Sequence, residues 1–79
     1  MEYKYRIIVL LAQKQLQTGL GIRTVREQAS RASRLSYSQF NRLARLPSNS
    51  TEAFTDTALY ALSHYFRVDI DELFNNTNY

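Results

Sequence analysis

Glycine and proline interrupt this chain at only three positions, which are Gly19, Gly21 and Pro47. Glycine readily adopts the left-handed backbone that ends helices, and proline pushes the residue before it away from α geometry. These residues therefore divide the 79-residue sequence into three segments. Because the chain has the length of one small domain and contains no internal repeat, we expect the three segments to share a single core.

The first segment, "YRIIVLLAQKQLQTG", predicts a helix that ends at Gly19. Ile7, Leu10 and Leu11 follow helical spacing, and the residues after them are good helix formers. A β-strand at Tyr3–Leu11 is the competing interpretation, because β-branched and aromatic residues are dense there. We favour the helix because apolar and polar residues never alternate cleanly in this segment.

Two short helices are expected in the second segment. The first, at about Thr24–Ser33, has Thr24 as its N-cap and Glu27 three residues later, a spacing that predicts a capping box. Its buried side would be formed by apolar residues at helical spacing, namely Ile22, Val25 and Ala29.

The second of these helices, at about residues 36–45, has three signals at its start. Ser36 is a favourable N-cap, and Gln39 three residues later completes another capping box. Leu35 before the cap and Phe40 four residues after it form a hydrophobic staple. Because the three signals agree on one position, they predict a helix start at Ser36.

The third segment predicts two further helices. "DTALYALSHYF" places apolar residues at helical spacing, with Thr55 or Asp56 as the cap. "VDIDELF" follows the same logic, with Asp69 as the cap and Glu72 closing a box. Residues 75–79 are expected to form a frayed tail. The sum is a compact all-α domain of five helices without a sheet.

Charge is distributed unevenly along the chain. Residues 22–47 contain six arginines against Glu27 alone, a balance of +5. Residues 48–79 contain Arg67 against five acidic residues, a balance of −4. This asymmetry predicts a polyanion-binding face on the first half of the chain, with an ordinary solvated surface as the other interpretation.

Several classes of function lack the residues that they require. The chain has no Cys, and the only histidine, His64, cannot build a zinc site in one chain, so no metal is expected. We find no nucleophile–base pair and no Gly-rich phosphate loop, so we expect neither an enzyme nor a cofactor. No apolar run approaches the ~18 residues of a membrane span. A Cys-free domain suits a reducing cytoplasm, including the nucleoid of a bacterium.

Two helices joined by the short connection "SRLS" form a helix-turn-helix pattern at about residues 24–45. The second helix is rich in Ser, Gln, Asn and Arg. These side chains suit the major groove, because Arg can bond both acceptors of guanine and Asn or Gln can bond adenine.

The sequence "TALYALSHYFRVDIDELF", Thr57–Phe74, resembles the fourth and fifth helices of phage-repressor and Cro-type helix-turn-helix domains (lambda repressor-like, XRE). "LSYSQFNRLAR" is similar to the recognition helix of that family, with Leu35, Phe40 and Leu43 in its buried positions. The resemblance covers about residues 6–74. It implies a compact five-helix DNA-binding domain whose second short helix enters the major groove.

The turn departs from the family's pattern, in which an Ala is followed four residues later by Gly and then directly by an apolar residue. Here Ala29 is followed at that spacing by Ser33, and Leu35 comes one residue later than expected. Either Arg34 is inserted in the turn, or Ser30 takes the place of the Ala. The loop after the recognition helix is longer and lacks the usual Gly, so we transfer no loop contacts.

The resemblance implies two sets of DNA contacts. The residues expected to contact base edges are Tyr37, Ser38, Asn41, Arg42 and Arg45. The residues expected to contact the DNA backbone are Ser36, Gln39, Arg23, Arg26, Arg31 and Arg34. Gln39 is ambiguous, because an amide that closes the capping box is not available to a base.

The function implied by the resemblance is a transcriptional regulator, most directly a repressor, that binds double-stranded DNA. Such modules commonly bind as homodimers on paired half-sites. A dimer of this chain would use the acidic C-terminal half or the tail, or would form only on DNA. The alternative is a helical protein-interaction module, an adaptor or antitoxin-like partner whose arginine face meets an acidic protein.

Overall fold

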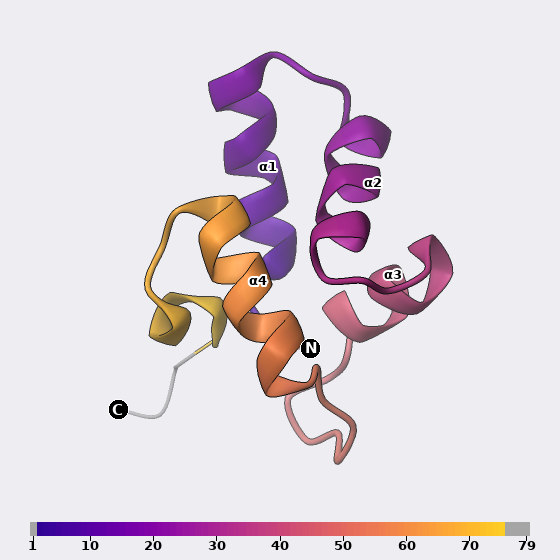
Figure 1. Ribbon diagram of the computed structural model, residues 1–79. Helices are drawn as coiled ribbons and strands as arrows, with labels where there is room; N and C mark the ends of the chain where they lie inside the picture. The colour runs from indigo at the N-terminus through magenta and orange to yellow at the C-terminus, as the bar shows by residue number, and fades with distance from the viewer. Residues whose placement is uncertain (1, 76–79) are drawn as a thin grey trace.

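The computed structural model describes residues 2–75 and consists of four α-helices and one short 3-10 helix (Figure 1). In chain order the elements are α1 (Ile7–Thr18), α2 (Ile22–Ala32), α3 (Tyr37–Ala44), α4 (Asp56–Phe66) and η1 (Ile70–Leu73). Within the described residues no β-strand forms, so the predicted all-α class is confirmed. No helix between residues 2 and 75 is long and apolar enough to cross a membrane.

The expected fifth α-helix is a single 3-10 turn of four residues, η1. Its start follows the prediction, because the Asp69 N–H donates to Glu72 Oε2 at 2.9 Å. The element stops early because the chain then pairs with the N-terminal segment. The Arg6 N–H donates to the Leu73 carbonyl at 2.7 Å, which holds the end of η1 against the start of α1. The expected count of five helices is therefore not confirmed in residues 2–75.

α2 packs against α1, α3 and α4, so it forms the middle of the domain. Figure 1 shows α1 and α2 side by side and α3 at the outer edge, next to α2. The loop between α3 and α4 contributes Phe54 to the core, where its ring centroid lies 5.0 Å from that of Tyr5 and 6.0 Å from that of Phe40. The largest fully buried side chains are Tyr5, Phe40, Ile7, Leu11, Leu62, Leu73 and Val25. Because α3 packs mainly on α2, one side of α3 remains exposed.

Three predicted helix boundaries are confirmed. Gly19 follows α1 in the left-handed conformation, with φ 73°. Ser36 Oγ accepts from the Gln39 N–H at 3.2 Å at the start of α3. Thr55 Oγ1 accepts from the Ala58 N–H at 3.2 Å at the start of α4. Each signal is local in sequence, and each fixes the boundary through a local backbone conformation or hydrogen bond.

α2 begins earlier than predicted, at Ile22, with Gly21 as its N-cap. Thr24 lies inside the first turn and its side chain forms no cap bond, so the predicted capping box of Thr24 and Glu27 is wrong. The earlier start places Ile22 on the same side of the helix as the buried Val25. A glycine N-cap is only a few tenths of a kcal/mol worse than a polar one. The packing of the partly buried Ile22 against the core therefore outweighs the local cap signal.

The turn between α2 and α3 is closed by a Schellman-type motif centred on Arg34. Arg34 is left-handed, with φ 60°. Its N–H donates to the Arg31 carbonyl, and the Leu35 N–H donates to the Ser30 carbonyl, both at 3.0 Å. Arg34 thus lies outside both helices, as predicted, and Leu35 directly follows the left-handed residue.

The start of the chain is extended and pairs with two distant segments. Tyr3 forms an antiparallel bridge with Pro47, and Tyr5 forms one with Phe74. The competing interpretation of a strand at Tyr3–Leu11 is therefore wrong, because Tyr3 and Tyr5 form only isolated bridges and α1 begins at Ile7. The helical interpretation is confirmed for the rest of the segment.

Of the expected frayed tail, Asn75 is hydrogen-bonded to this extended start. Its N–H donates to the Lys4 carbonyl and its Nδ2 to the Tyr3 carbonyl, both at 3.1 Å. The remaining residues of the expected tail, 76–79, lie outside the described residues.

Candidate nucleic-acid interface

The side of α3 that points away from the core carries the five residues expected to contact bases. Spacings of three and four residues link them along one side of α3, and the last of them, Arg45, is the C-cap that follows the helix. They are Tyr37, Ser38, Asn41, Arg42 and Arg45, of which Tyr37 and Asn41 are half-buried and the others exposed. The opposite side is formed by the buried Phe40, Leu43 and Ala44. We call the first set the outward face of α3.

Ser36 and Gln39 lie at the N-terminal end of α3. The Ser36 hydroxyl is engaged as the cap, because it accepts from the Gln39 N–H. The reciprocal bond, in which the Ser36 N–H would donate to the Gln39 side chain, is not found among the hydrogen bonds of residues 2–75, so only half of the predicted capping box forms. Gln39 is exposed, so its amide is available for another contact.

Arg23 of α2 contacts α3 directly. Its guanidinium carbon lies 4.8 Å from the ring centroid of Tyr37, a cation–π distance. Its Nε lies 3.9 Å from Glu27 Oε2. Arg23 therefore connects the start of α2 with the start of α3, beside the outward face of α3. The sequence did not predict this contact, because its partners lie in different helices.

The other arginines predicted to contact the DNA backbone are spread along α2 and the turn. Arg26 is half-buried, and its Nε is shielded from solvent without a hydrogen-bond partner in the described part of the chain. Arg31 and Arg34 are exposed at the C-terminal end of α2 and in the turn. No ion pair formed within residues 2–75 involves these three residues or Arg45. Unlike Arg23, none of the three is joined to the outward face of α3 by a polar contact.

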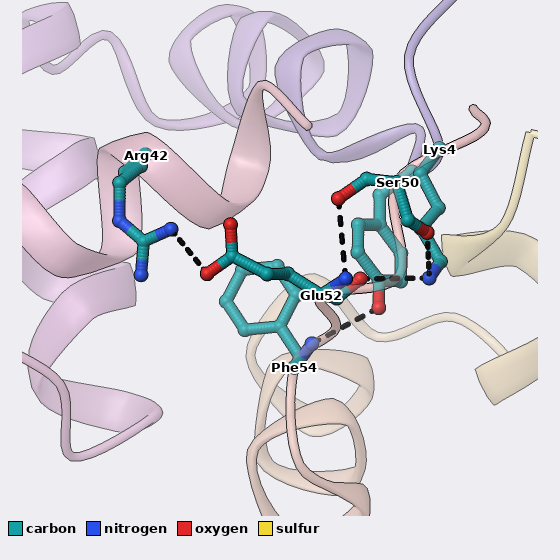
Figure 2. Close-up of polar contacts among 6 residues, drawn as sticks. Lys4, Arg42, Ser50, Glu52 and Phe54 are labelled. Atoms are coloured by element: carbon teal, nitrogen blue, oxygen red, sulfur yellow. Dashed lines mark hydrogen bonds and ion pairs between the residues drawn. The ribbon is translucent and has the colours of Figure 1, made fainter. Parts of the chain in front are cut away.

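Arg42 has an acidic partner that the sequence did not predict. Its Nη1 donates to Glu52 Oε2 at 2.5 Å, and both side chains are about half exposed. Figure 2 shows the Glu52 carboxylate reaching from the loop between α3 and α4 to the guanidinium of Arg42. Glu52 follows Arg42 by ten residues, and no periodic pattern distinguishes it from the other acidic residues of the C-terminal half.

The loop that carries Glu52 is hydrogen-bonded to the extended start of the chain (Figure 2). Lys4 Nζ donates to the Glu52 carbonyl at 2.8 Å and to the Ser50 carbonyl at 3.2 Å. The Glu52 N–H donates to Ser50 Oγ at 3.2 Å. Two residues later, the Phe54 N–H donates to the Tyr5 hydroxyl at 3.0 Å. These bonds fix the backbone at Glu52 and directly after it.

Two tyrosine hydroxyls outside α3 have raised pKa values. Burial raises the pKa of Tyr5 above its usual 10.0, and the hydrogen bond from the Phe54 N–H offsets part of this rise. Burial likewise raises the pKa of Tyr65. His64 is exposed on α4, and no group of three or more potential metal ligands is found in the described residues.

The chain matches no protein-family model, no curated protein and no solved structure.

Proposed function

We propose that the protein binds double-stranded DNA sequence-specifically, as a transcriptional regulator, with α3 in the major groove. The observation that carries this proposal is the outward face of α3, which presents Asn41 and Arg42 together while the core covers the other side. Asparagine can bond adenine and arginine can bond guanine, each through two hydrogen bonds. An α-helix with its side chains is about 10–12 Å wide, which fits a major groove of about 12 Å.

The phosphate contacts in this proposal come from α2 and from the start of α3. The N-terminus of a helix attracts anions, so the first N–H groups of α3 and the Ser36 hydroxyl would bind one phosphate. Arginines of α2 and the turn would add positive charge along the DNA backbone.

The turn between α2 and α3 also supports the proposal. The left-handed Arg34 lies directly before Leu35, which favours the alignment in which Ser30 replaces the Ala of the phage-repressor pattern and Arg34 replaces the Gly of that pattern.

Binding to random-sequence duplex DNA at several salt concentrations tests the first part of the proposal. Each phosphate contact releases counterions and contributes about −0.9 to the slope of log K against log salt. For about five contacts we expect a slope of about −4 to −5. An absence of binding at low salt would contradict DNA binding of any kind.

The second part concerns α3, and it is tested with the double variant Asn41→Ala, Arg42→Ala. Sequences selected from random DNA by the unchanged protein define the preferred site. Each lost bidentate contact removes about 1–3 kcal/mol of discrimination, so the variant should fold but lose most of its preference. Arg67→Ala is the matched control, because it removes one exposed arginine next to α4. An unchanged preference in the double variant would mean that α3 does not face the groove.

The proposed complex contains two copies of the chain. The domain measures 33 × 25 × 22 Å, so two copies can occupy neighbouring half-sites one turn of B-DNA, about 34 Å, apart. One copy would thus cover one half-site, and the selected sequences should form an inverted repeat with half-sites about 10 base pairs apart. A selected site without symmetry would indicate binding by a single copy.

The rival function, a protein-interaction module, has one specific observation in its favour. Leu16 is 87% exposed and Val9 is 48% exposed, both on α1. Val9 and Leu16 are seven residues apart and thus lie on one side of α1, and an apolar patch on one exposed side is typical of surfaces that bind another protein. Because α1 and α3 lie on different sides of α2 in Figure 1, the variant Leu16→Ser should leave DNA affinity unchanged if α3 binds DNA. An absence of DNA binding at low salt would favour the protein-interaction function.

A further inference from the structure

The Arg42–Glu52 ion pair lies on the outward face of α3, where the proposed function needs a guanidinium available for bases. Both groups are about half exposed. An exposed pair of this kind contributes little to stability and is weakened by salt. The pair therefore adds little to folding, and its position on the outward face of α3 calls for another explanation.

Glu52 is held in place by more than its bond to Arg42. Lys4 Nζ binds the carbonyls of Glu52 and Ser50, and Ser50 Oγ accepts from the Glu52 N–H. The backbone of Glu52 is thus fixed by side chains from residues far apart in sequence. Because the backbone that carries the carboxylate is fixed beside α3, less conformational entropy is lost when the carboxylate binds the guanidinium of Arg42.

The geometry of arginine permits two partners at once. The guanidinium is planar and has five N–H donors, and the described ion pair runs through Nη1 of Arg42 alone. Guanine requires two donors for its O6 and N7 acceptors. The remaining nitrogens, Nη2 and Nε, supply them while Nη1 stays on the carboxylate.

We propose that Glu52 is a specificity-determining positioning residue, which holds Arg42 in place for a guanine and away from phosphates. This inference rests on the proposed DNA-binding function. Without Glu52, Arg42 is a flexible cation, and the nearest strong partner for such a cation on DNA is a phosphate of any sequence. Glu52 thus lowers the sequence-independent affinity for DNA and raises the discrimination between bases.

The test compares the unchanged protein with Glu52→Gln and Glu52→Ala on random duplex DNA and on its selected site. In Glu52→Ala, the freed Arg42 reaches a phosphate, so the salt slope on random DNA steepens by about 0.9 and binding tightens. Discrimination in favour of guanine at one position of the selected site falls by roughly tenfold. Glu52→Gln keeps the size of the side chain and should show the same changes in weaker form. Thermal unfolding of each variant confirms that it is folded.

The same substitution in an Arg42→Ala background separates positioning from simple repulsion. If Glu52 acts through Arg42, Glu52→Ala should change neither the slope nor the base preference once Arg42 is gone. If it still tightens binding there, Glu52 acts by repelling DNA and the inference is overturned. Asp71→Asn is the matched control, because it removes one exposed negative charge in η1, outside α3 and its loop, and should leave the base preference unchanged.

The two proposals fail in different ways. If the unchanged protein does not bind random DNA at low salt, the proposed function is wrong and this inference falls with it. If the unchanged protein selects a site, and Glu52→Ala matches it in slope and in base preference, DNA binding stands and only the role of Glu52 is disproved.

Discussion

Two arginines adopt the left-handed backbone conformation that glycine favours. Arg34 follows α2 with φ 60°, and Arg67 follows α4 with φ 58°. In each case the next residue, Leu35 or Val68, donates its N–H at 3.0 Å to the carbonyl of a serine in the preceding helix. The same closure therefore ends both helices. In each, the Cβ atom costs about 1–2 kcal/mol that a glycine would avoid.

Arg34→Gly is expected to raise the free energy of unfolding by about 1 kcal/mol, and Arg67→Gly by a similar amount, because the left-handed strain is removed. Urea unfolding followed by circular dichroism measures the change. Arg31→Gly is the matched control inside α2 and should lower stability by about 1 kcal/mol. A loss of stability in Arg34→Gly would show that the arginine side chain makes a contact that outweighs the strain.

Helix boundaries follow the sequence where the signal and its partner lie within one turn. Ser36 caps α3, and Thr55 caps α4, as predicted from their neighbours. The prediction is wrong at Thr24, because α2 starts earlier and includes Ile22, which packs partly buried against the core. η1 stops early for a similar reason, since its last residues pair with the start of the chain. Local rules therefore place an element correctly until tertiary contacts compete with them.

The variants Ser36→Ala and Thr24→Ala compare a residue that caps its helix, α3, with one that was predicted to cap α2 and does not. Ser36→Ala removes the acceptor for the Gln39 N–H and should cost about 1 kcal/mol of stability. Thr24→Ala replaces an exposed residue inside α2 with a better helix former, so stability should stay the same or rise slightly. Denaturant unfolding of the two variants under one condition gives the comparison. Equal losses would mean that Thr24 caps α2 after all.

The candidate site was predictable only in part. The outward face of α3 follows from helical spacing, which places four of its residues on the helix and Arg45 at its C-cap. The partners of two of them do not follow from spacing. Arg23 stacks on Tyr37 from another helix, and Glu52 reaches Arg42 from a loop whose position depends on Lys4. Contacts between distant segments require the fold itself, so no local pattern could give them.

The extended start of the chain joins distant parts of the molecule, and Tyr5 is the central residue of these contacts. The Tyr5 ring packs against Phe54 from the loop and Phe74 from the C-terminal end, with centroids 5.0 and 5.5 Å apart. Its hydroxyl accepts from the Phe54 N–H, and its backbone forms the bridge with Phe74. One side chain near the start thus joins the loop beside α3 to the end of the described chain.

Tyr5→Phe should therefore lower the free energy of unfolding at neutral pH by about 1–3 kcal/mol, because the buried Phe54 N–H loses its acceptor. The loss of stability caused by Tyr5→Phe should depend on pH. Burial raises the pKa of Tyr5 in the folded protein above 10.0, so on raising the pH the unfolded chain loses this proton first. The stabilisation by Tyr5 is complete below pH about 10 and declines as pH rises through the folded pKa.

The difference in stability between the unchanged protein and Tyr5→Phe should therefore shrink above pH about 10, as measured by urea unfolding across a pH series. Tyr60→Phe serves as the control, since Tyr60 is 58% exposed and its substitution should change stability little at neutral pH. A difference that stays constant through this range would mean that the Tyr5 hydroxyl titrates alike in the folded and unfolded chain. In that case burial by Phe54 and Phe74 would not shield it, and the closure of the molecule at Tyr5 would be looser than its contacts indicate.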